Sequence, residues 1–530
     1  MKPEKPANAT TSTEVDRQER VLDFLGGTVL SDAKDGRRID THASVVFLDD
    51  NRALKVKRAV RLPFLDYSTL EKRKGACEEE LKINSAYAPE LYRRVVPITR
   101  RDDGVFEVGG TGTPVEWAVE MVRFDEQRTF DRIAEAETIH PALAAALADA
   151  ILRSHDKAAP ADGKTWLASI PSIIDRNTTK FRAMGGLEPA AIDHLHARSH
   201  DTFARLRTLL ERRAAWGFVR RCHGDLHLAN IALVNGQPLL FDAIEFDPVI
   251  ATTDVLYDLA FTLMDLLHFD NGAAANIVFN RYLAEVTAER LDGIGILPLF
   301  LSMRAAIRAH VLFTRSEQAW ASEAIWQEAK RYFDLAGRLV MPKSPTLVGI
   351  GGMSGTGKSV LARGLAGMIE PPPGALLVRS DVVRKHLFNA DEITALPDAA
   401  YQPGASARVY ETVLGTARHV LAQGFSVILD ASFMQEMQRR AVARLARETH
   451  VRFVGLFLIA GLAIRLTRIA DRKHDASDAT RDVALKQETT AIGALDWHVV
   501  DASGTPDDML RRSVCYLSEG KCEPDLDVEQ

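Results

Sequence analysis

The chain has 530 residues, and at roughly 100–200 residues per domain this length predicts two to four domains. Hydrophobic residues make up 46% and charged residues 26%, as in a globular protein with sizeable cores, which excludes wholesale disorder. The formal net charge of −6 provides no basic footprint for nucleic acid and no polybasic membrane patch, although it does not exclude a bound polynucleotide.

The chain ends and the cysteines give three further expectations. Residues 1–20 lack the apolar core of a signal peptide and predict a short disordered leader. No apolar run approaches the roughly 18–20 residues of a membrane span, so we expect no membrane segment. The spacing of Cys77, Cys222, Cys515 and Cys522 suggests neither a disulfide framework nor a zinc site, so we expect free thiols in a cytoplasmic protein.

The division of the chain follows from its patterns, taken in chain order. Short alternating apolar segments dominate up to about residue 122, and mainly helical patterns follow up to about residue 338. Two prolines at 341–345 mark a linker. We therefore expect a leader at 1–20, a small lobe at 21–122, a helical large lobe at 123–340, the linker at 341–345 and a further domain at 346–530.

The C-terminal region alternates strand and helix. Strands are predicted at 346–350, 375–379, 426–429, 452–458 and 498–500, with helical patterns between them. This alternation predicts a parallel sheet with helices on both faces. The fold class is therefore multi-domain, α+β in the first region and α/β in the second.

The HGDLHLAN string at 223–230 has the HxDxxxxN spacing of kinase catalytic loops. After it, an Asn-Gly pair at 235–236 lies between two short apolar runs and predicts a hairpin. Pairing the two runs brings Asn230 beside Asp242 at the open end. We expect Asn230 and Asp242 to hold Mg²⁺, and Asp225 to orient or deprotonate an acceptor hydroxyl.

The second motif fits GxxxxGK(S/T) between a predicted strand and a predicted helix. Its members are Gly352, Met353, Ser354, Gly355, Thr356, Gly357, Lys358 and Ser359. The glycines let backbone N–H groups turn toward phosphates at the N-terminus of a helix. Lys358 is expected to reach the β- and γ-phosphates of ATP, and Ser359 to ligate Mg²⁺.

Two aspartates follow strands of the same predicted sheet. The ligand edge of an open α/β sheet lies at the carboxyl ends of its strands, so Asp381 and Asp430 should face the phosphate loop. Asp430 is expected to help hold Mg²⁺, and Asp381 to accept the proton of an attacking hydroxyl. Capping of the following helix remains the alternative for both residues.

These motifs carry two resemblances. HGDLHLAN followed by LFDAIEFD resembles the aminoglycoside phosphotransferases, a branch of the protein-kinase-like enzymes with two lobes. That resemblance implies a phosphate-binding Lys55 in ALKVK, with Glu80 as its ion-pair partner. It also implies an adenine-binding hinge at Met121 and Val122. Lys57 shares a strand face with Lys55, and Glu78 and Glu79 adjoin Glu80, so these alternatives stay open.

The C-terminal region resembles P-loop kinases of the nucleoside- and gluconate-kinase type, with polynucleotide kinases among their relatives. This implies a lid whose arginine closes on the transferring phosphoryl group, with Arg472 preferred over Arg468. A solvated basic face is the alternative. Both halves together resemble bacterial bifunctional aminoglycoside phosphotransferase/ATP-binding proteins.

The acceptor is less apparent from the sequence. Asp254, Asp258, Asp265 and Asp270 form an acidic run of the kind that lines cationic-sugar pockets in antibiotic kinases, but helix caps and outer-face charges give the same pattern. We expect a bifunctional ATP- and Mg²⁺-dependent kinase of small hydroxyl-bearing molecules, with no nucleic-acid or membrane partner and an open oligomeric state. The alternatives are an aminoglycoside kinase, a polynucleotide 5′-kinase and an ATP-sensing regulator.

Overall fold

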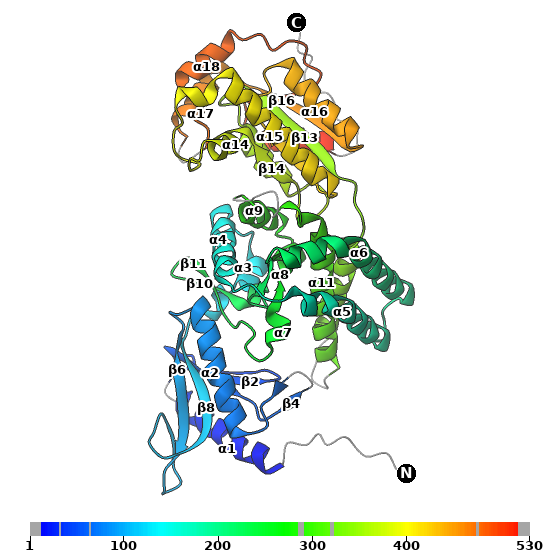
Figure 1. Cartoon of the computed structure of the whole chain (residues 1–530). Helices are drawn as coiled ribbons and strands as arrows, with labels where there is room; N and C mark the ends of the chain where they lie inside the picture. The colour runs from blue at the N-terminus through cyan, green and yellow to red at the C-terminus, as the bar shows by residue number, and fades with distance from the viewer. Residues whose placement is uncertain are drawn as a thin grey trace. The chain divides into compact units, whose positions relative to one another are not determined.

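The computed structural model describes residues 12–30, 33–62, 65–284, 291–317, 323–472 and 476–517. They form two compact units, each discontinuous in sequence (Figure 1). Unit 1 comprises Met1–Ile139, Asp149–Ser172 and Glu211–Asp265, and unit 2 comprises His140–Ala148, Ile173–Leu210 and Leu266–Gln530. The fold class is the predicted one, because unit 1 contains an antiparallel sheet with helices and unit 2 a parallel sheet with helices. The units do not follow the predicted linear boundaries, because parts of the helical region group with the C-terminal sheet.

Unit 1 contains a six-stranded antiparallel sheet in the order β1-β2-β3-β8-β6-β7. Its strands are β1 (Arg37–Asp40), β2 (Ser44–Leu48), β3 (Arg52–Lys57), β8 (Thr113–Val122), β6 (Tyr92–Arg100) and β7 (Phe106–Val108). Strands β4 (Arg61–Leu62) and β5 (Leu65–Asp66) pair with each other. Helix α2 (Leu70–Tyr87) follows β5 in the chain and precedes β6. Because side chains alternate along β3, Leu54 and Val56 enter the apolar core, while Lys55 and Lys57 project from the opposite face.

Helix α1 (Ser12–Val29) covers the apolar face of this sheet through Val21, Leu22 and Leu25. The prediction of a disordered leader is therefore wrong for residues 12–20, and residues 1–11 lie outside the described residues. Buried Gln18 explains the difference, because its carboxamide donates to the Lys57 carbonyl and accepts from the Ala59 N–H, both at 2.8 Å. The polar composition of this segment concealed these bonds.

The rest of unit 1 carries the predicted hairpin. Strands β10 (Ile231–Val234) and β11 (Gln237–Leu240) pair in the register Ile231↔Leu240. Asn235 and Gly236 form the turn with φ of 51° and 75°, as the Asn-Gly pair predicts. The other elements are α3 (Phe130–Ala136), β9 (Val219–Arg221), α7 (Pro248–Ala251) and β12 (Thr252–Asp254). Four helices have residues in both units, namely α4 (Pro141–Lys157), α5 (Gly163–Ala183), α6 (Pro189–Ala215) and α8 (Val255–His268).

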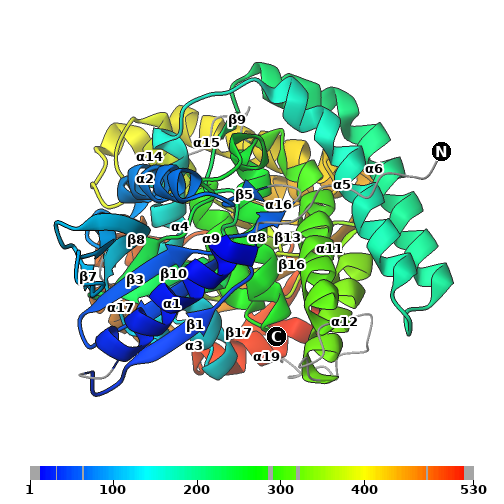
Figure 2. The ribbon, with the colours of Figure 1, turned by 90° about the horizontal axis from the view of Figure 1, so that it is seen from below.

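In the part of the chain that the structure describes, further helices of unit 2 lie between α8 and its sheet. They are α9 (Gly272–Tyr282), α11 (Leu297–Ser316) and α12 (Glu323–Leu339), and Figure 2 shows α11 and α12 side by side. Among the described residues, Ile294–Ser316 is long and apolar enough to cross a membrane, with a mean hydropathy of 1.5. The sequence analysis overlooked this stretch because Arg304 and Arg308 interrupt it. With 67% of the segment buried in the fold, it has the character of a core helix.

The five strands predicted for the C-terminal region are all present, within two residues at their ends. They are β13 (Thr346–Gly352), β14 (Leu376–Arg379), β15 (Val427–Asp430), β16 (Arg452–Ile459) and β17 (His498–Asp501). They form one parallel sheet in the order β14-β15-β13-β16-β17. The helices are α13 (Lys358–Ala366), α14 (Ser380–Leu387), α15 (Pro403–Ala422), α16 (Glu436–Glu448), α17 (Leu462–Ala470), α18 (Arg481–Glu488) and α19 (Pro506–Leu517).

The cysteines only partly match the expectation of free thiols. Cys77 and Cys222 are buried and lie outside any disulfide. Cys515 is disulfide-bonded, so the expectation is wrong at this position. Cys522 lies outside the described residues.

Trp497 gives the central strands of the parallel sheet a testable packing constraint. A Cβ added at Gly455 in β16 would lie 2.5 Å from Trp497 Cγ, whereas at Gly415 in α15 it would meet nothing within 4 Å. We expect Gly455→Ala to lower the free energy of unfolding by about 1–3 kcal/mol because the ring cannot yield space. Gly415→Ala should raise it by about 0.5–1 kcal/mol through helix propensity. Urea unfolding followed by circular dichroism measures both, and equal effects would contradict this account of the packing.

Candidate functional site

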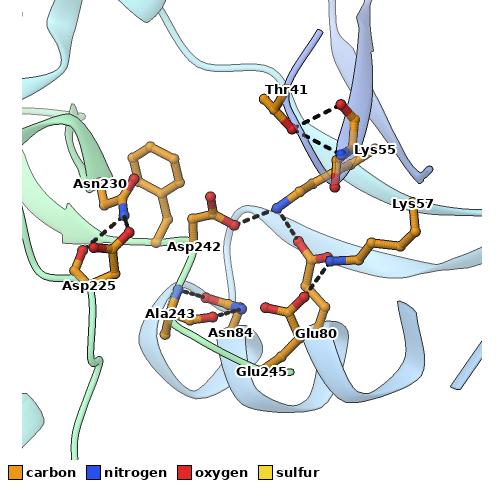
Figure 3. Close-up of polar contacts among 12 residues, drawn as sticks. Thr41, Lys55, Lys57, Glu80, Asn84, Asp225, Asn230, Asp242, Ala243 and Glu245 are labelled. Carbon is orange, nitrogen blue, oxygen red and sulfur yellow. Dashed lines mark hydrogen bonds and ion pairs between the residues drawn. The ribbon is translucent and has the colours of Figure 1, made fainter. Parts of the chain in front are cut away.

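A buried ion-pair network lies on the polar face of the unit 1 sheet. Lys55 Nζ is 2.8 Å from Glu80 Oε1 and 2.5 Å from Asp242 Oδ1. Figure 3 shows Lys55 between these two carboxylates, which come from α2 and from the segment after β11. Glu78 and Glu79 instead pair with lysines on their own helix. The geometry therefore favours Glu80 as the partner of Lys55, and the nucleotide-binding role of the pair stays a prediction.

Lys57 enters the same network, which the sequence analysis did not expect. Its Nζ lies 2.5 Å from Glu80 Oε2 and also pairs with Glu245. Glu80 thus receives a different lysine on each carboxylate oxygen. The sequence analysis placed both lysines on one strand face, but it treated Lys57 as an alternative to Lys55 and not as a second partner of Glu80.

The charges in this network stabilise one another strongly. Burial disfavours the charged form of Glu80, but Lys55 and Lys57 outweigh it and lower the pKa of Glu80 to about 2. Burial likewise opposes the charge of Lys55, yet Asp242 and Glu80 raise the pKa of Lys55 well above its usual value. Both lysines and Glu80 therefore stay ionised at neutral pH.

In the predicted catalytic loop, Asn230 lies in contact with Asp225 and beside the backbone that leads to Asp242. Asn230 Nδ2 donates to the Asp225 carbonyl at 2.9 Å and to Asp225 Oδ2 at 3.2 Å (Figure 3). The Phe241 N–H donates to the Asn230 carbonyl at 3.0 Å, which brings Asp242 to the same end of the hairpin. The side chains of Asp225 and Asp242 are 41% and 40% exposed, so a ligand can reach both.

Asn84 and Tyr92, two residues that sequence reasoning missed, hold the backbone around Asp242. Asn84 Oδ1 accepts from the Ala243 N–H at 2.7 Å, and its Nδ2 donates to the Ala243 carbonyl at 3.2 Å. The Tyr92 hydroxyl accepts from the Asp242 N–H at 3.2 Å. Asp242 itself has a φ of 61°, a conformation that needs such support.

The acidic run is not an outer face or an exposed pocket lining. Asp254, Asp258 and Asp265 are buried. Asp258 accepts from the backbone N–H groups of His223 and Gly224 at 3.3 and 2.9 Å, and Asp265 accepts from that of Leu228 at 3.0 Å. These carboxylates position the loop that carries Asp225. Asp270, the fourth residue of the run, is the exception, because it is exposed and lies in unit 2.

The predicted hinge residues Met121 and Val122 end β8, where the sheet meets the rest of unit 1. The next residue, Arg123, donates to the backbone carbonyls of Asp35 and Asp49 at 2.8 and 2.9 Å. Arg123 therefore fixes the strand end at which an adenine is expected. Its role was not evident from the sequence because both acceptors lie more than 70 residues away.

The phosphate loop of unit 2 has the conformation that its motif requires. Gly352 and Gly355 have φ of 137° and 83°, and a Cβ at either would lie 2.6 Å from a backbone carbonyl oxygen. Lys358 Nζ donates to the Met353 carbonyl at 3.0 Å and so crosses the loop. The Ser354 N–H donates to Gln487 Oε1 at 2.7 Å, a contact from α18 that the motif does not reveal.

The side chains expected to hold Mg²⁺ in unit 2 lie together. Ser359 Oγ donates to Asp430 Oδ2 at 2.5 Å. Arg379, at the end of β14, lies 3.3 Å from Asp430 Oδ2 through Nε and donates to Ser359 Oγ at 3.2 Å through Nη2. Sequence reasoning missed Arg379, although its register partner in the sheet is Asp430.

Asp381 lies in the first turn of α14, and Asp430 uses its carboxylate on Ser359 rather than as a helix cap. Burial and the charge of Asp430 raise the pKa of Asp381. Burial lowers the pKa of Lys358 despite the attraction of Asp430 and Asp381. A raised pKa makes the Asp381 carboxylate a stronger base than an exposed aspartate, and its role as the proton acceptor stays a prediction.

The donor sets of both sites fit a magnesium ion. The amide oxygen of Asn230 and the carboxylate of Asp242 in unit 1, and the hydroxyl of Ser359 and the carboxylate of Asp430 in unit 2, are the hard oxygen ligands that Mg²⁺ prefers. In each unit a lysine accompanies these oxygens, which suits a phosphate that bridges metal and cation.

The two lid candidates, Arg468 and Arg472, and the neighbouring Arg465 differ in their partners. Arg465 is fully buried and pairs with Glu488. Arg468 donates to the Ala502 and Gly504 carbonyls at 2.8 Å each, which ties α17 to the loop before α19. Arg472 lies two residues beyond α17, with the Ser477 carbonyl 3.5 Å away. Arg465 and Arg468 are therefore held in the fold, and the lid role expected of Arg472 stays a prediction.

The chain is similar to known proteins in its C-terminal region and along most of its length. Residues 347–491 match the AAA domain family model. An uncharacterised protein of Mycobacterium tuberculosis is 29% identical over 482 residues, which cover 88% of this chain and 92% of that protein. The resemblance therefore extends through both halves.

Solved structures to which the chain is similar include an aminoglycoside phosphotransferase and a gluconokinase. A mutant aminoglycoside 2′-phosphotransferase-IIIa in complex with GDP covers 59% of this chain and 96% of its own, with 15% identity and a TM-score of 0.36. A gluconokinase from Sinorhizobium meliloti covers 33% of this chain and 93% of its own, with 17% identity and a TM-score of 0.24.

The shared carboxylate predicts an acid-dependent stability. The pKa of Glu80 is lowered from 4.5 to about 2, so its ionisation contributes about 3 kcal/mol that is present above pH 4.5 and lost as the pH falls toward 2. In urea unfolding, Glu80→Gln should be destabilised at pH 7, and its difference from wild type should shrink over that interval. Glu79→Gln, which removes the surface pair with Lys82, should change stability by less than about 1 kcal/mol. A difference independent of pH would contradict the proposed charge state.

Substitution of Arg468 is expected to lower stability, whereas substitution of Arg472 is expected to lower activity alone. Arg468→Ala leaves two carbonyls without their donor, so we expect a loss of about 1–3 kcal/mol in the free energy of unfolding. Arg472→Ala should leave unfolding unchanged and slow phosphoryl transfer at the unit 2 site by about 10²–10³-fold. Unfolding curves and γ-phosphate transfer assays on both variants measure this. The assignment fails if Arg472→Ala retains wild-type transfer.

Proposed function

We propose that the protein is an ATP- and Mg²⁺-dependent phosphotransferase with two sites, each transferring a γ-phosphoryl group to a hydroxyl of a small molecule. The observation that carries the proposal is that each unit sets a lysine near the carboxylate suited to hold magnesium. Lys55 contacts Asp242 in unit 1, and Lys358 opens the helix on which Ser359 contacts Asp430 in unit 2. The two arrangements use unrelated folds for the same electrostatic task.

In unit 1, the acceptor hydroxyl lies at Asp225, which is exposed and oriented by Asn230. The acceptor oxygen forms a bond to the γ-phosphorus, the bond from that phosphorus to the β,γ-bridging oxygen breaks, and ADP leaves. The hydroxyl proton passes to Asp225. Lys55, held by buried Glu80, neutralises phosphate charge, and Met121 and Val122 contact the adenine. Magnesium, when bound at Asn230 and Asp242, supplies further charge neutralisation.

In unit 2, the backbone N–H groups of 352–359 and the Lys358 ammonium hold the phosphates. Gln487 leaves the Ser354 N–H and Lys358 leaves the Met353 carbonyl when the nucleotide enters, because both contacts occupy phosphate-binding groups. Asp381 takes the acceptor proton, and Arg472 approaches the transferring group. Magnesium at Ser359 and Asp430 supplies charge neutralisation.

A small-molecule acceptor fits the chain better than a polynucleotide. The net charge of −6 gives no extended basic surface for a phosphate backbone. The fusion suggests linked steps, such as two phosphorylations of one metabolite.

The experiment is a metabolite-extract screen with γ-labelled ATP on wild type, Asp225→Asn and Lys358→Ala. Asp225→Asn should lower labelling of one product by about 10²–10⁴-fold because the proton acceptor is lost. Lys358→Ala should abolish labelling of the other. Loss of one product in both single variants indicates sequential steps. Equal ATP consumption by all three proteins would refute both sites.

A further inference from the structure

Strand β14 lies at the edge of the parallel sheet and pairs with β15 on one side. An edge strand leaves backbone N–H and C=O groups of alternate residues without a strand partner. The Leu376 N–H donates toward β15, to the Ser426 carbonyl at 2.9 Å. The Ala375 carbonyl and the Leu377 N–H therefore point away from the sheet.

Helix α9 supplies the missing partner through one side chain. Asn280 Nδ2 donates to the Ala375 carbonyl at 3.1 Å, and Asn280 Oδ1 accepts from the Leu377 N–H at 2.7 Å. This donor and acceptor pair is the one that a neighbouring strand would present. A second amide, buried Asn276, also donates to the Ala375 carbonyl at 3.1 Å.

The approach of α9 is close along this edge, all within unit 2 (Figure 1). A Cβ at Gly374 would lie 2.6 Å from Asn276 Nδ2, and a Cβ at Gly367 would lie 3.2 Å from the backbone of Gly272 and Ala273. Elsewhere in unit 2, Gln423 clamps the segment before α11, donating to the Leu291 carbonyl at 2.8 Å and accepting from the Gly295 N–H at 3.3 Å.

The strand that Asn280 holds carries the unit 2 site. Arg379 lies two positions after Leu377, roughly 7 Å along an extended strand. Arg379 contacts Asp430 and Ser359, the pair expected to hold magnesium, and Asp381 follows two residues later. The position of the β14 end thus sets the position of these side chains.

We propose that Asn280 is a positioning residue for the P-loop site. From a helix that precedes the linker, it acts as the edge neighbour of β14 and fixes the strand end that aligns Arg379 with Asp430 and Ser359. This inference rests on the proposed nucleotide and Mg²⁺ binding at that site. It assigns the C-terminal phosphotransferase a structural part that lies about 65 residues before its first strand.

The test measures how much Mg²⁺ increases the affinity of the full-length protein for a fluorescent ADP analogue. Only the part of the binding that is lost in Lys358→Ala is assigned to the P-loop site. Asn280→Leu keeps the side-chain size and removes both bonds to β14. We expect it to reduce the Mg²⁺ gain about tenfold, while metal-free affinity changes less than about twofold, because two hydrogen bonds are lost at a distance from the nucleotide. Gln423→Leu removes a comparable amide clamp away from the site and should keep the wild-type gain.

The outcomes are distinct. The positioning role is overturned if Asn280→Leu keeps the wild-type Mg²⁺ gain, or if Gln423→Leu loses as much. If Asn280→Leu does not fold, Asn280→Asp retains the acceptor for Leu377 and should show a smaller loss in the same direction, and a wild-type gain in that folded variant also overturns the role. Absence of any Lys358-dependent binding in the wild type would instead overturn the proposed function, and this inference with it.

Discussion

The unit 1 site depends on a carboxylate that has no exposed surface. Glu80 is fully buried between two lysines, and none of the three could be buried alone without a large desolvation cost. Sharing the charge this way fixes helix α2 against strand β3, since Lys55 and Lys57 both project from that strand. Lys57 is also paired with buried Glu245, so Lys55 is the lysine of this pair that reaches the half-exposed Asp242.

The buried aspartates of α8 provide the second constraint of unit 1. Asp258 and Asp265 accept from backbone N–H groups on both sides of Asp225, so the catalytic loop is held by charge-assisted bonds rather than by a regular strand. Asp225 can therefore remain 41% exposed while its backbone is fixed. An exposed carboxylate on a fixed backbone suits the proton-accepting role proposed for Asp225.

Much of this could be predicted from the sequence, because its signals are local. The phosphate loop, the HxDxxxxN string, the Asn-Gly turn and the five parallel strands each depend on residues within a few positions of one another. Arg379, Asn84, Gln487 and Asn280 could not be found this way, because each acts through a backbone or side-chain partner far away in sequence. The prediction of a disordered leader was wrong for a related reason. Gln18 forms buried hydrogen bonds to Lys57 and Ala59, about 40 residues away, and the polar composition of the segment gives no sign of them.

The edge of the parallel sheet shows why the linear boundary at 341–345 misses part of the C-terminal unit. A strand edge must be paired, covered or made repulsive, and β14 has no strand beyond it. A carboxamide offers a donor and an acceptor at the spacing of two strand groups, and Asn280 uses both. An apolar helix would cover the same surface yet leave the Leu377 N–H buried without a partner, at a cost of about 1–3 kcal/mol. The chemistry of that edge, rather than apolar contact alone, therefore specifies which helix packs there, and it ties the end of β14 to a segment encoded before the linker.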